Sequence, residues 1–283
     1  MKCPACGSST RLRQLRLDRA LLAECPTCGH LNTLGVTLRL SADDYPADAS
    51  ALSLYERLYL CARRASYSRG LDALGSGLGR RLLDVGSNYG HFLALAEARG
   101  WTAIGYEPGA RLRASALPQV VDRIFGSRDE IRGAAPFDAI TLWDVLEHVE
   151  APGPELRDLA ALLDPDGTLL VRVPDARVFA ALRRAVWRPL APIYLKLCHP
   201  TNPEEHVSHF TPASLEAFAA DAGLRMVACL DAPPDERVAA GRTTFDSMVR
   251  RGLHALGRAL PYEFTALLRV DEGAARQAQL GGA

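Results

Sequence analysis

Residues 82–92 read LLDVGSNYGHF, and the expectations for the rest of the chain start from this stretch. An apolar run ends at Asp84, then a short segment rich in glycine and small polar residues follows, and the helix-compatible sequence HFLALAEARG comes next. Glycines let a backbone turn tightly and approach a ligand closely. The stretch therefore predicts a strand, a glycine loop and a helix N-terminus. Loops of this outline bind several classes of cofactor, so the loop alone does not identify the ligand.

Strands and helices alternate from residue 81 onward. The expected strands are RLLDVG, TAIGYEP, QVVDRIF, FDAITLW, TLLVRVPD and, near the end, EFTALLRV; the expected helices include GHFLALAEARG, GARLRASA and PELRDLAALLDPDG. A further helix should begin with Thr211 as its N-cap and Pro212 at its first position. This alternation predicts an α/β fold, a parallel sheet with helices on both faces. Ligands of such sheets bind at the carboxyl ends of the strands.

Four of the seven cysteines form two Cys-Pro-x-Cys-Gly pairs near the N-terminus, and they are Cys3, Cys6, Cys25 and Cys28. The glycine after each pair permits a left-handed turn, and four thiolates satisfy a tetrahedral Zn²⁺ ion. We therefore expect a structural zinc ribbon over residues 1–40, with His30 as a bystander. Four unrelated free cysteines are the alternative, which the repeated pattern disfavours.

The remaining chain divides into two further regions. Residues 41–79 predict a helical lead-in, in which Cys61 shares an apolar face and is a core residue rather than a nucleophile. Residues 80–283 form the main domain. Within it, residues 176–210 place arginines among prolines and aromatic residues and predict a cap over the strand ends.

Composition excludes some classes of protein. Lys+Arg and Asp+Glu both number 33, so the whole molecule is not a strongly basic nucleic-acid binder. No apolar run approaches the roughly 18 residues of a membrane span, and the N-terminus does not read as a signal peptide. The expected localisation is cytoplasmic, where clustered cysteines indicate metal rather than disulfides.

Five segments together resemble the class I S-adenosylmethionine-dependent methyltransferases over about residues 80–230. They are LLDVGSNYGHF, IGYEP, FDAITLWDVLEHVEAP, LLDPDGTLLVRVPD and EEHVSHFTPASLEAFAADAGL. The resemblance implies a Rossmann-like, seven-stranded, mostly parallel sheet and S-adenosylmethionine as the cofactor. Asn88 stands where the first loop of this family usually has its middle glycine.

The resemblance also implies a cofactor site along the strand ends. The expected residues are Asp84, Gly86, Ser87, Asn88, Gly90, Glu107, Ser127, Trp143 and Asp144. Asp84 would orient the loop and the cofactor's ammonium group, Glu107 would accept hydrogen bonds from both ribose hydroxyls, and Ser127 would face the adenine. Trp143 and Asp144 would lie near the transferable methyl group, although core packing is the common fate of an isolated tryptophan.

Methyl transfer is a displacement at a sulfonium carbon, so the protein must align the acceptor and remove any proton that it carries. Three histidines are candidates for the base. His206 ranks first because Glu205 precedes it and can orient an imidazole. His148, in the sequence EHV, ranks second. The alternative for His148 is a structural role beneath the cofactor. His209 ranks third.

The acceptor atom, which is oxygen, nitrogen or carbon, stays open. We expect a small-molecule or carrier-linked substrate in secondary-metabolite or sugar tailoring, since paired cysteine knuckles before GSN-x-G also resemble the C-methyltransferases of nucleotide-linked deoxysugars. One alternative is an RNA methyltransferase, because residues 1–40 carry six basic and two acidic residues. Another is a non-catalytic scaffold protein. A nicotinamide-dependent dehydrogenase fits poorly because the G-x-G-x-x-G spacing is absent.

Overall fold

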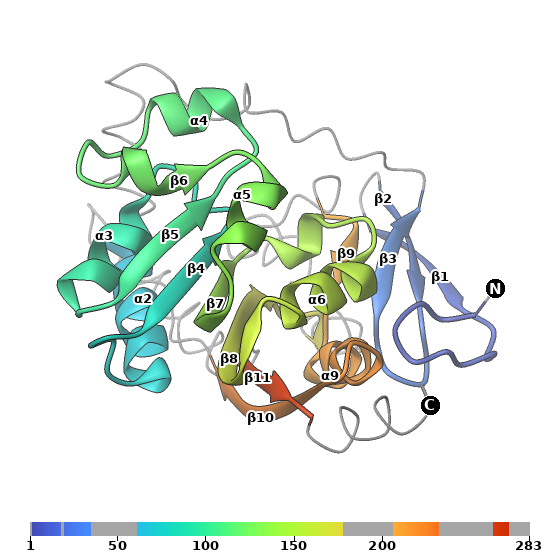
Figure 1. Ribbon diagram of the computed structural model, residues 1–283. Coiled ribbons are helices and arrows are strands. Elements are labelled where there is room, and N and C mark those ends of the chain that lie inside the picture. The colour runs from blue at the N-terminus through green and yellow to red at the C-terminus, as the bar shows by residue number, and fades with distance from the viewer. Residues whose placement is uncertain (1, 18–19, 35–60, 178–205, 232–262, 272–283) are drawn as a thin grey trace, which may run out of the picture.

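Two β-sheets organise the protein (Figure 1). The computed structural model describes residues 2–17, 20–34, 61–177, 206–231 and 263–271. Within them the larger sheet has seven strands: β4 (Arg81–Val85), β5 (Thr102–Tyr106), β6 (Ile124–Phe125), β7 (Phe137–Trp143), β8 (Leu163–Pro174), β10 (Leu224–Asp231) and β11 (Glu263–Val270). Their order is β10-β11-β8-β7-β4-β5-β6. This arrangement confirms the expected Rossmann-like, mostly parallel sheet.

Strand β4 lies where the strand order reverses. It pairs in parallel with β5 on one side and with β7 on the other, and β6 and β8 extend the two sides. β10 and β11 are antiparallel additions beside β8. The parallel strands read as continuous apolar runs because both faces of the sheet are covered. Ligands bind outside the carboxyl ends of strands at such a reversal, which directs attention to the ends of β4, β5 and β7.

Helices cover both faces of the large sheet (Figure 1). They are α2 (Cys61–Leu74), α3 (His91–Ala98), α4 (Ala110–Ala114), α5 (Arg128–Gly133), α6 (Pro152–Ala160) and α9 (Pro212–Asp221). Successive residues of a strand point to opposite faces. Leu82 belongs to an apolar cluster with Leu71 of α2 and Phe92 of α3, whereas Leu83 belongs to a second cluster with Leu156 of α6.

Helix α9 begins as the sequence predicts. The Thr211 hydroxyl accepts a hydrogen bond from the backbone N–H of Ser214 at 3.1 Å, and the Ser214 hydroxyl accepts one from the backbone N–H of Thr211 at 2.9 Å. Pro212 occupies the first turn, where its missing N–H has no cost. This reciprocal cap fixes the chain that leads into α9.

The smaller sheet joins the N-terminal ribbon to the main domain (Figure 1). Its strands are β1 (Arg13–Leu17), β2 (Ala20–Glu24), β3 (Leu31–Leu34) and β9 (Ser208–His209), in the order β1-β2-β3-β9. β3 pairs antiparallel with β9, so Leu31 faces His209 and Asn32 faces Ser208. The ribbon is therefore hydrogen-bonded to the segment that immediately precedes α9.

Two expected elements have different limits. QVVDRIF contributes only the strand β6, because the short 3-10 helix η3 (Val121–Arg123) precedes it. The helix expected to run to Gly167 ends at Ala160, and β8 already begins at Leu163. Leu163 pairs with Phe137 of β7, so pairing in the sheet overrides the helix-compatible sequence there.

Parts of two predicted regions lie outside the described residues. They are residues 41–60 of the helical lead-in and residues 178–205 of the cap, which include Glu205. Helix α2 occupies the last part of the lead-in. In the part of the chain that the structure describes, none of the helices combines the length and apolar character needed to cross a membrane.

Candidate active site and metal centre

The glycine loop after β4 is tied to the end of β5 through Glu107. One carboxylate oxygen of Glu107 accepts a hydrogen bond from the backbone N–H of Asn88 at 3.1 Å, and the other accepts one from Gly109 at 2.9 Å. Glu107 is buried, and this burial raises the pKa of its carboxyl, while the two backbone hydrogen bonds act in the opposite direction. Each oxygen keeps capacity to accept a further hydrogen bond. The contact of Glu107 with two ribose hydroxyls stays a prediction, which this geometry permits.

The loop itself needs left-handed backbone at three positions. Gly86, Asn88 and Gly90 have φ values of 72°, 51° and 82°. A Cβ atom on Gly86 would lie 2.6 Å from Val145, and one on Gly90 would lie 2.4 Å from Val120. Asparagine tolerates left-handed backbone better than most residues. Asn88 therefore fits the position where related loops usually have glycine.

The other loop amides bond within the protein. The backbone N–H groups of Gly86 and Ser87 donate to the Tyr106 carbonyl at 2.8 and 3.1 Å. Ser87 packs against Gly105, where an added Cβ would lie 2.5 Å from the Ser87 hydroxyl. These two hydrogen bonds hold the loop against β5.

Asp84 lies beneath the loop in β4. Its carboxylate accepts a hydrogen bond from the Thr141 hydroxyl at 2.7 Å and is 3% exposed. Burial raises the pKa of Asp84 to about 8, with the negative charge of Glu107 adding to the shift. A cation near Asp84 would stabilise its ionised form, which is consistent with the predicted role of orienting an ammonium group.

Trp143 is packed in the core. Its ring centroid lies 4.8 Å from that of Tyr67 and 5.1 Å from that of Phe92. A Cβ atom on Gly70 of α2 would lie 2.6 Å from the indole, so a glycine is needed there. These contacts favour the packing interpretation of Trp143. Ser127 caps α5 by accepting a hydrogen bond from Asp129 at 3.2 Å.

Asp144 belongs to an ion cluster that sequence reasoning missed. It pairs with Arg172 of β8 at 2.6 Å and with Arg63 of α2, and Arg172 also pairs with Glu263 of β11. Arg172 is 4% exposed. The sequence held one signal for this cluster, a single arginine inside the apolar strand TLLVRVPD. A buried charge needs a partner, so this arginine indicates an ion pair.

The fold brings two of the candidate bases together with a buried glutamate. Glu147 and His148 belong to the 3-10 helix η4 (Leu146–His148) after β7, and the Glu147 carbonyl accepts a hydrogen bond from Val207 at 3.0 Å. The ring centroids of His148 and His206 are 4.5 Å apart. One ligand atom from each of Glu147, His148 and His206 lies within 4.8 Å of the others. We call these three residues the Glu-His-His cluster.

Burial is uneven across the Glu-His-His cluster. Glu147 and His206 are 1% and 7% exposed, while His148 is half-buried. Burial raises the pKa of Glu147 well above its usual range, and the nearby charge of Asp144 adds to this shift. Sequence reasoning treated His148 and His206 as separate alternatives and did not single out Glu147, whose position in EHV was the only local signal.

His209 is directed toward the ribbon. Its Nε2 atom lies 3.0 Å from the Thr33 hydroxyl, which donates its single proton to the His206 carbonyl at 2.6 Å. His209 Nε2 must therefore carry the proton in its contact with Thr33. This contact favours a structural role for His209 over the predicted catalytic one.

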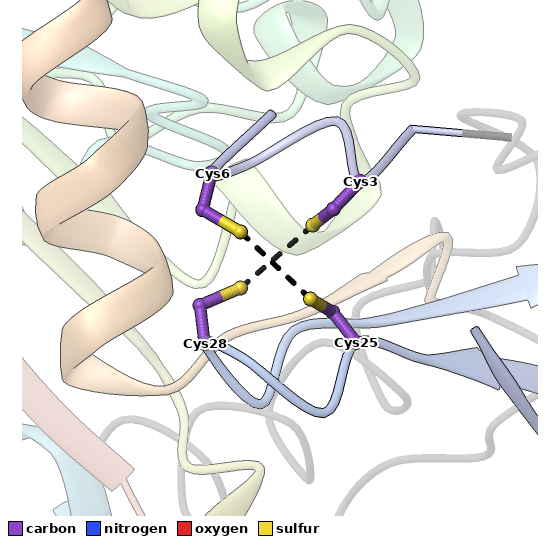
Figure 2. Close-up of side chains that lie close together, drawn as sticks. All are labelled: Cys3, Cys6, Cys25 and Cys28. Carbon is purple, nitrogen blue, oxygen red and sulfur yellow. Dashed lines mark hydrogen bonds between the residues drawn. The ribbon is translucent and has the colours of Figure 1, made fainter. Parts of the chain in front are cut away.

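The four cysteines of the ribbon converge on one point (Figure 2). The Sγ atoms of Cys3 and Cys28 are 3.7 Å apart, and those of Cys6 and Cys25 are 3.8 Å apart. Four sulfurs at about 2.3 Å from a central zinc ion in a tetrahedron lie about 3.8 Å from one another. The glycines after the two pairs have positive φ, as predicted. The cysteine cluster thus fits a tetrahedral Zn²⁺ ion.

His30 is not part of the cysteine cluster. Its ring packs at 5.4 Å from Phe210 and 5.2 Å from Phe218, and it is 2% exposed. Burial lowers the pKa of His30 to about 4, so the imidazole is neutral. His30 contributes apolar packing between the ribbon and α9.

Comparison with known proteins gives one family match and several relatives. The family described as "Methyltransferase domain" matches residues 59–229. The "Ubiquinone biosynthesis O-methyltransferase" of Aeromonas salmonicida (strain A449) is 29% identical over 161 residues, which are 54% of this chain and 66% of that protein. Its namesake from Xanthomonas axonopodis pv. citri (strain 306) is 32% identical over 157 residues, 52% of this chain and 64% of that protein. The match thus spans just under two thirds of these relatives.

The chain also resembles part of a tRNA-modifying enzyme and two proteins of known structure. The "tRNA U34 carboxymethyltransferase" of Syntrophotalea carbinolica is 37% identical over 102 residues, 33% of this chain and 32% of that protein. The cyclopropane synthase MmaA2 from Mycobacterium tuberculosis has a TM-score of 0.51 at 16% identity, covering 73% of this chain and 84% of its own. An S-adenosylmethionine-dependent methyltransferase from Aquifex aeolicus has a TM-score of 0.50 at 14% identity, covering 81% and 98%. At these identities the structures show a shared fold.

Proposed function

Because the chain belongs to the class I S-adenosylmethionine-dependent methyltransferases, we propose that it transfers a methyl group to an oxygen atom of a small-molecule or carrier-linked substrate. The observation that carries this proposal is the common position of two features. The glycine loop with Glu107 lies at the ends of β4 and β5, and the Glu-His-His cluster follows the end of β7. The proposed cofactor site and the group proposed to handle an acceptor proton therefore share one edge of the sheet.

Two observations support an oxygen acceptor: the names of two relatives and the position of the imidazoles. Relatives that are 29% and 32% identical carry the name O-methyltransferase. A hydroxyl group also needs to lose its proton when it attacks a methyl group, and the imidazoles beside β7 offer a place for that proton. His206 remains the first candidate for the base and His148 the second.

S-adenosylmethionine would be held mainly by the loop after β4 and by Glu107. The hydrogen bonds from Asn88 and Gly109 fix the Glu107 carboxylate before the cofactor arrives, so little ordering is required on binding. Asp84 would stabilise the positive end of the methionine group. When bound, the cofactor supplies an electrophilic methyl group on a sulfonium, and the residues around it align the acceptor.

The cysteine cluster would hold one structural zinc ion. Its four thiolates fill the tetrahedral coordination sphere, so no position is left for a substrate or a water molecule. In this proposal zinc stabilises the ribbon and, through β9, the chain around His206.

Methyl transfer is tested by incubating the protein with S-adenosylmethionine that carries a labelled methyl group, together with a panel of phenolic and carrier-linked hydroxyl compounds. Label in the product and a tenfold lower rate with acceptors whose hydroxyl is already methylated would support the proposal. Label on carbon or nitrogen would contradict the oxygen acceptor. Failure to bind S-adenosylmethionine in calorimetry would favour the scaffold alternative.

An RNA substrate is the second candidate. It is supported by the 37% identity to a tRNA carboxymethyltransferase over 102 residues and by the six basic residues in positions 1–40. RNA binding that weakens steeply as the salt concentration rises, with label transferred to the RNA, would favour it over a small molecule.

A further inference from the structure

Two imidazoles and a carboxylate meet at the end of β7, and this set of ligands is typical of metal sites in which coordination positions stay open. We propose that Glu147, His148 and His206 bind a divalent transition-metal cation. The cation site is separate from the four cysteines, whose coordination sphere is closed. The role of this cation in the reaction deepens the proposed function and rests on its oxygen acceptor.

The geometry of the Glu-His-His cluster is close to that of a bound state. One ligand atom from each residue lies within 4.8 Å of the others. Ligand atoms at about 2.1 Å from a shared ion lie about 3 Å from each other, so small rotations of the side chains complete the site. The rings of His148 and His206 are steeply inclined, at 83°, which lets their nitrogens approach a single ion from two directions.

Glu147 provides an independent observation in favour of a cation. Its side chain is 1% exposed, and neither carboxylate oxygen has a hydrogen-bond partner in another of the described residues. A buried carboxylate in this condition lacks the partner that such groups normally require. The two arginines in its surroundings, Arg63 and Arg172, form ion pairs with Asp144. A bound cation would satisfy Glu147 directly.

The backbone holds the three ligands in place from both sides. Val207 donates its N–H to the Glu147 carbonyl at 3.0 Å, which joins the two segments that carry the ligands. Thr33 of the ribbon adds two hydrogen bonds: its N–H donates to the Val207 carbonyl at 2.9 Å, and its hydroxyl donates to the His206 carbonyl at 2.6 Å. Ligands on supported backbone are the basis of a preorganised metal site.

The cation would prepare the acceptor for methyl transfer. A hydroxyl that coordinates a divalent cation loses its proton more easily, and this proton leaves to solvent. The acceptor oxygen then forms a bond to the methyl carbon, the bond from that carbon to sulfur breaks, and its electron pair stays on sulfur to give neutral S-adenosylhomocysteine. In this form of the reaction His148 and His206 act as neutral ligands, and the cation takes the place of the base that the proposed function assigns to one of these two histidines.

Calorimetric titration of zinc-loaded protein with Co²⁺ tests this site. We expect one Co²⁺ ion per chain to bind while the zinc content stays constant. Glu147→Gln and His148→Gln should each weaken this binding at least tenfold, whereas His91→Gln, a histidine outside the cluster, should leave it unchanged. His148 is half-buried, so its variant tests the site even where the change at buried Glu147 impairs folding.

The outcomes separate this inference from the proposed function. Absent Co²⁺ binding, or equal binding by the His148 and His91 variants, would overturn the cation site even where methyl transfer proceeds. Co²⁺ binding that depends on Glu147 and His148, in a protein that methylates no hydroxyl acceptor, would support the site and contradict the proposed reaction.

Discussion

The cysteine cluster and the Glu-His-His cluster are built in opposite ways. Each half of the cysteine cluster is a short turn, since Cys3 and Cys6 are three residues apart, as are Cys25 and Cys28. The Glu-His-His cluster joins η4 to a residue of a distant segment, and backbone hydrogen bonds between the segments hold it. A site made of local turns can be recognised in a sequence, whereas a site made by tertiary contacts becomes visible only in the structure.

The largest expected effect comes from removing half of the cysteine cluster. Cys25→Ser together with Cys28→Ser should abolish zinc binding and unfold the ribbon, because binding of structural zinc contributes on the order of 10 kcal/mol to the folding of small zinc domains. Elemental analysis and thermal unfolding measure the two effects. Cys229→Ser, at an exposed cysteine of β10, is the matched control and should leave both unchanged. Intact zinc content in the double variant would show that the cluster is not the zinc site.

The next effect concerns the Glu-His-His cluster. His206→Ala should lower kcat by about 10² to 10⁴, because it removes a group that prepares the acceptor, either as base or as ligand. S-adenosylmethionine affinity, measured by calorimetry, should not change. A purely structural role for His206 predicts a higher KM or a lower melting temperature instead.

His209→Ala serves as the comparison within the same segment. Because His209 bonds Thr33 of the ribbon, its loss should reduce stability and leave kcat within a fewfold of the original value. If His206→Ala keeps nearly full kcat and His148→Ala loses it, His148 has the main role. If all three variants retain kcat, the acceptor needs no group from this cluster.

Glu107 provides an intermediate case between the two clusters. It follows the glycine loop at a spacing that the sequence can predict. Its carboxylate is fixed by one local hydrogen bond, from Gly109, and by one from Asn88 in the loop, which is a tertiary contact. Glu107→Ala should weaken S-adenosylmethionine binding at least tenfold, about 1.4 kcal/mol, in calorimetry. Glu97→Ala, which removes a carboxylate of α3 that pairs with Arg123, should not alter it. Unchanged affinity for the Glu107 variant would remove this residue from the site.

These cases explain how much the sequence could predict. The alternating strands, the cap of α9 at Thr211 and the two cysteine turns depend on neighbouring residues, and all three are confirmed. The pairing of β3 with β9 and the ion pairs of Arg172 with Asp144 and Glu263 join distant segments. No local pattern specifies which distant segments meet, so these features required the structure.

The smallest expected effect tests whether the two clusters depend on each other. Thr33 lies on β3 of the ribbon, and its hydroxyl bonds both the His206 carbonyl and the His209 ring. Thr33→Val keeps the shape of the side chain and leaves these two buried groups without that partner. Such a loss costs about 1–3 kcal/mol. We expect a lower melting temperature and faster amide hydrogen exchange in residues 206–211.

Thr33→Val should also lower kcat by a fewfold, because the His206 backbone gains freedom while the zinc site, at the other end of β3, stays intact. Thr10→Val is the control: Thr10 is exposed in the ribbon and bonds only nearby hydroxyls there, those of Ser8 and Thr27, among the contacts described. Faster exchange at 206–211 in the Thr33 variant alone, with full zinc content in both, would show that the ribbon supports the Glu-His-His cluster through this hydroxyl. Equal exchange in both variants would mean that the pairing of β3 with β9 holds the segment without it, and that the two clusters are neighbours but not coupled.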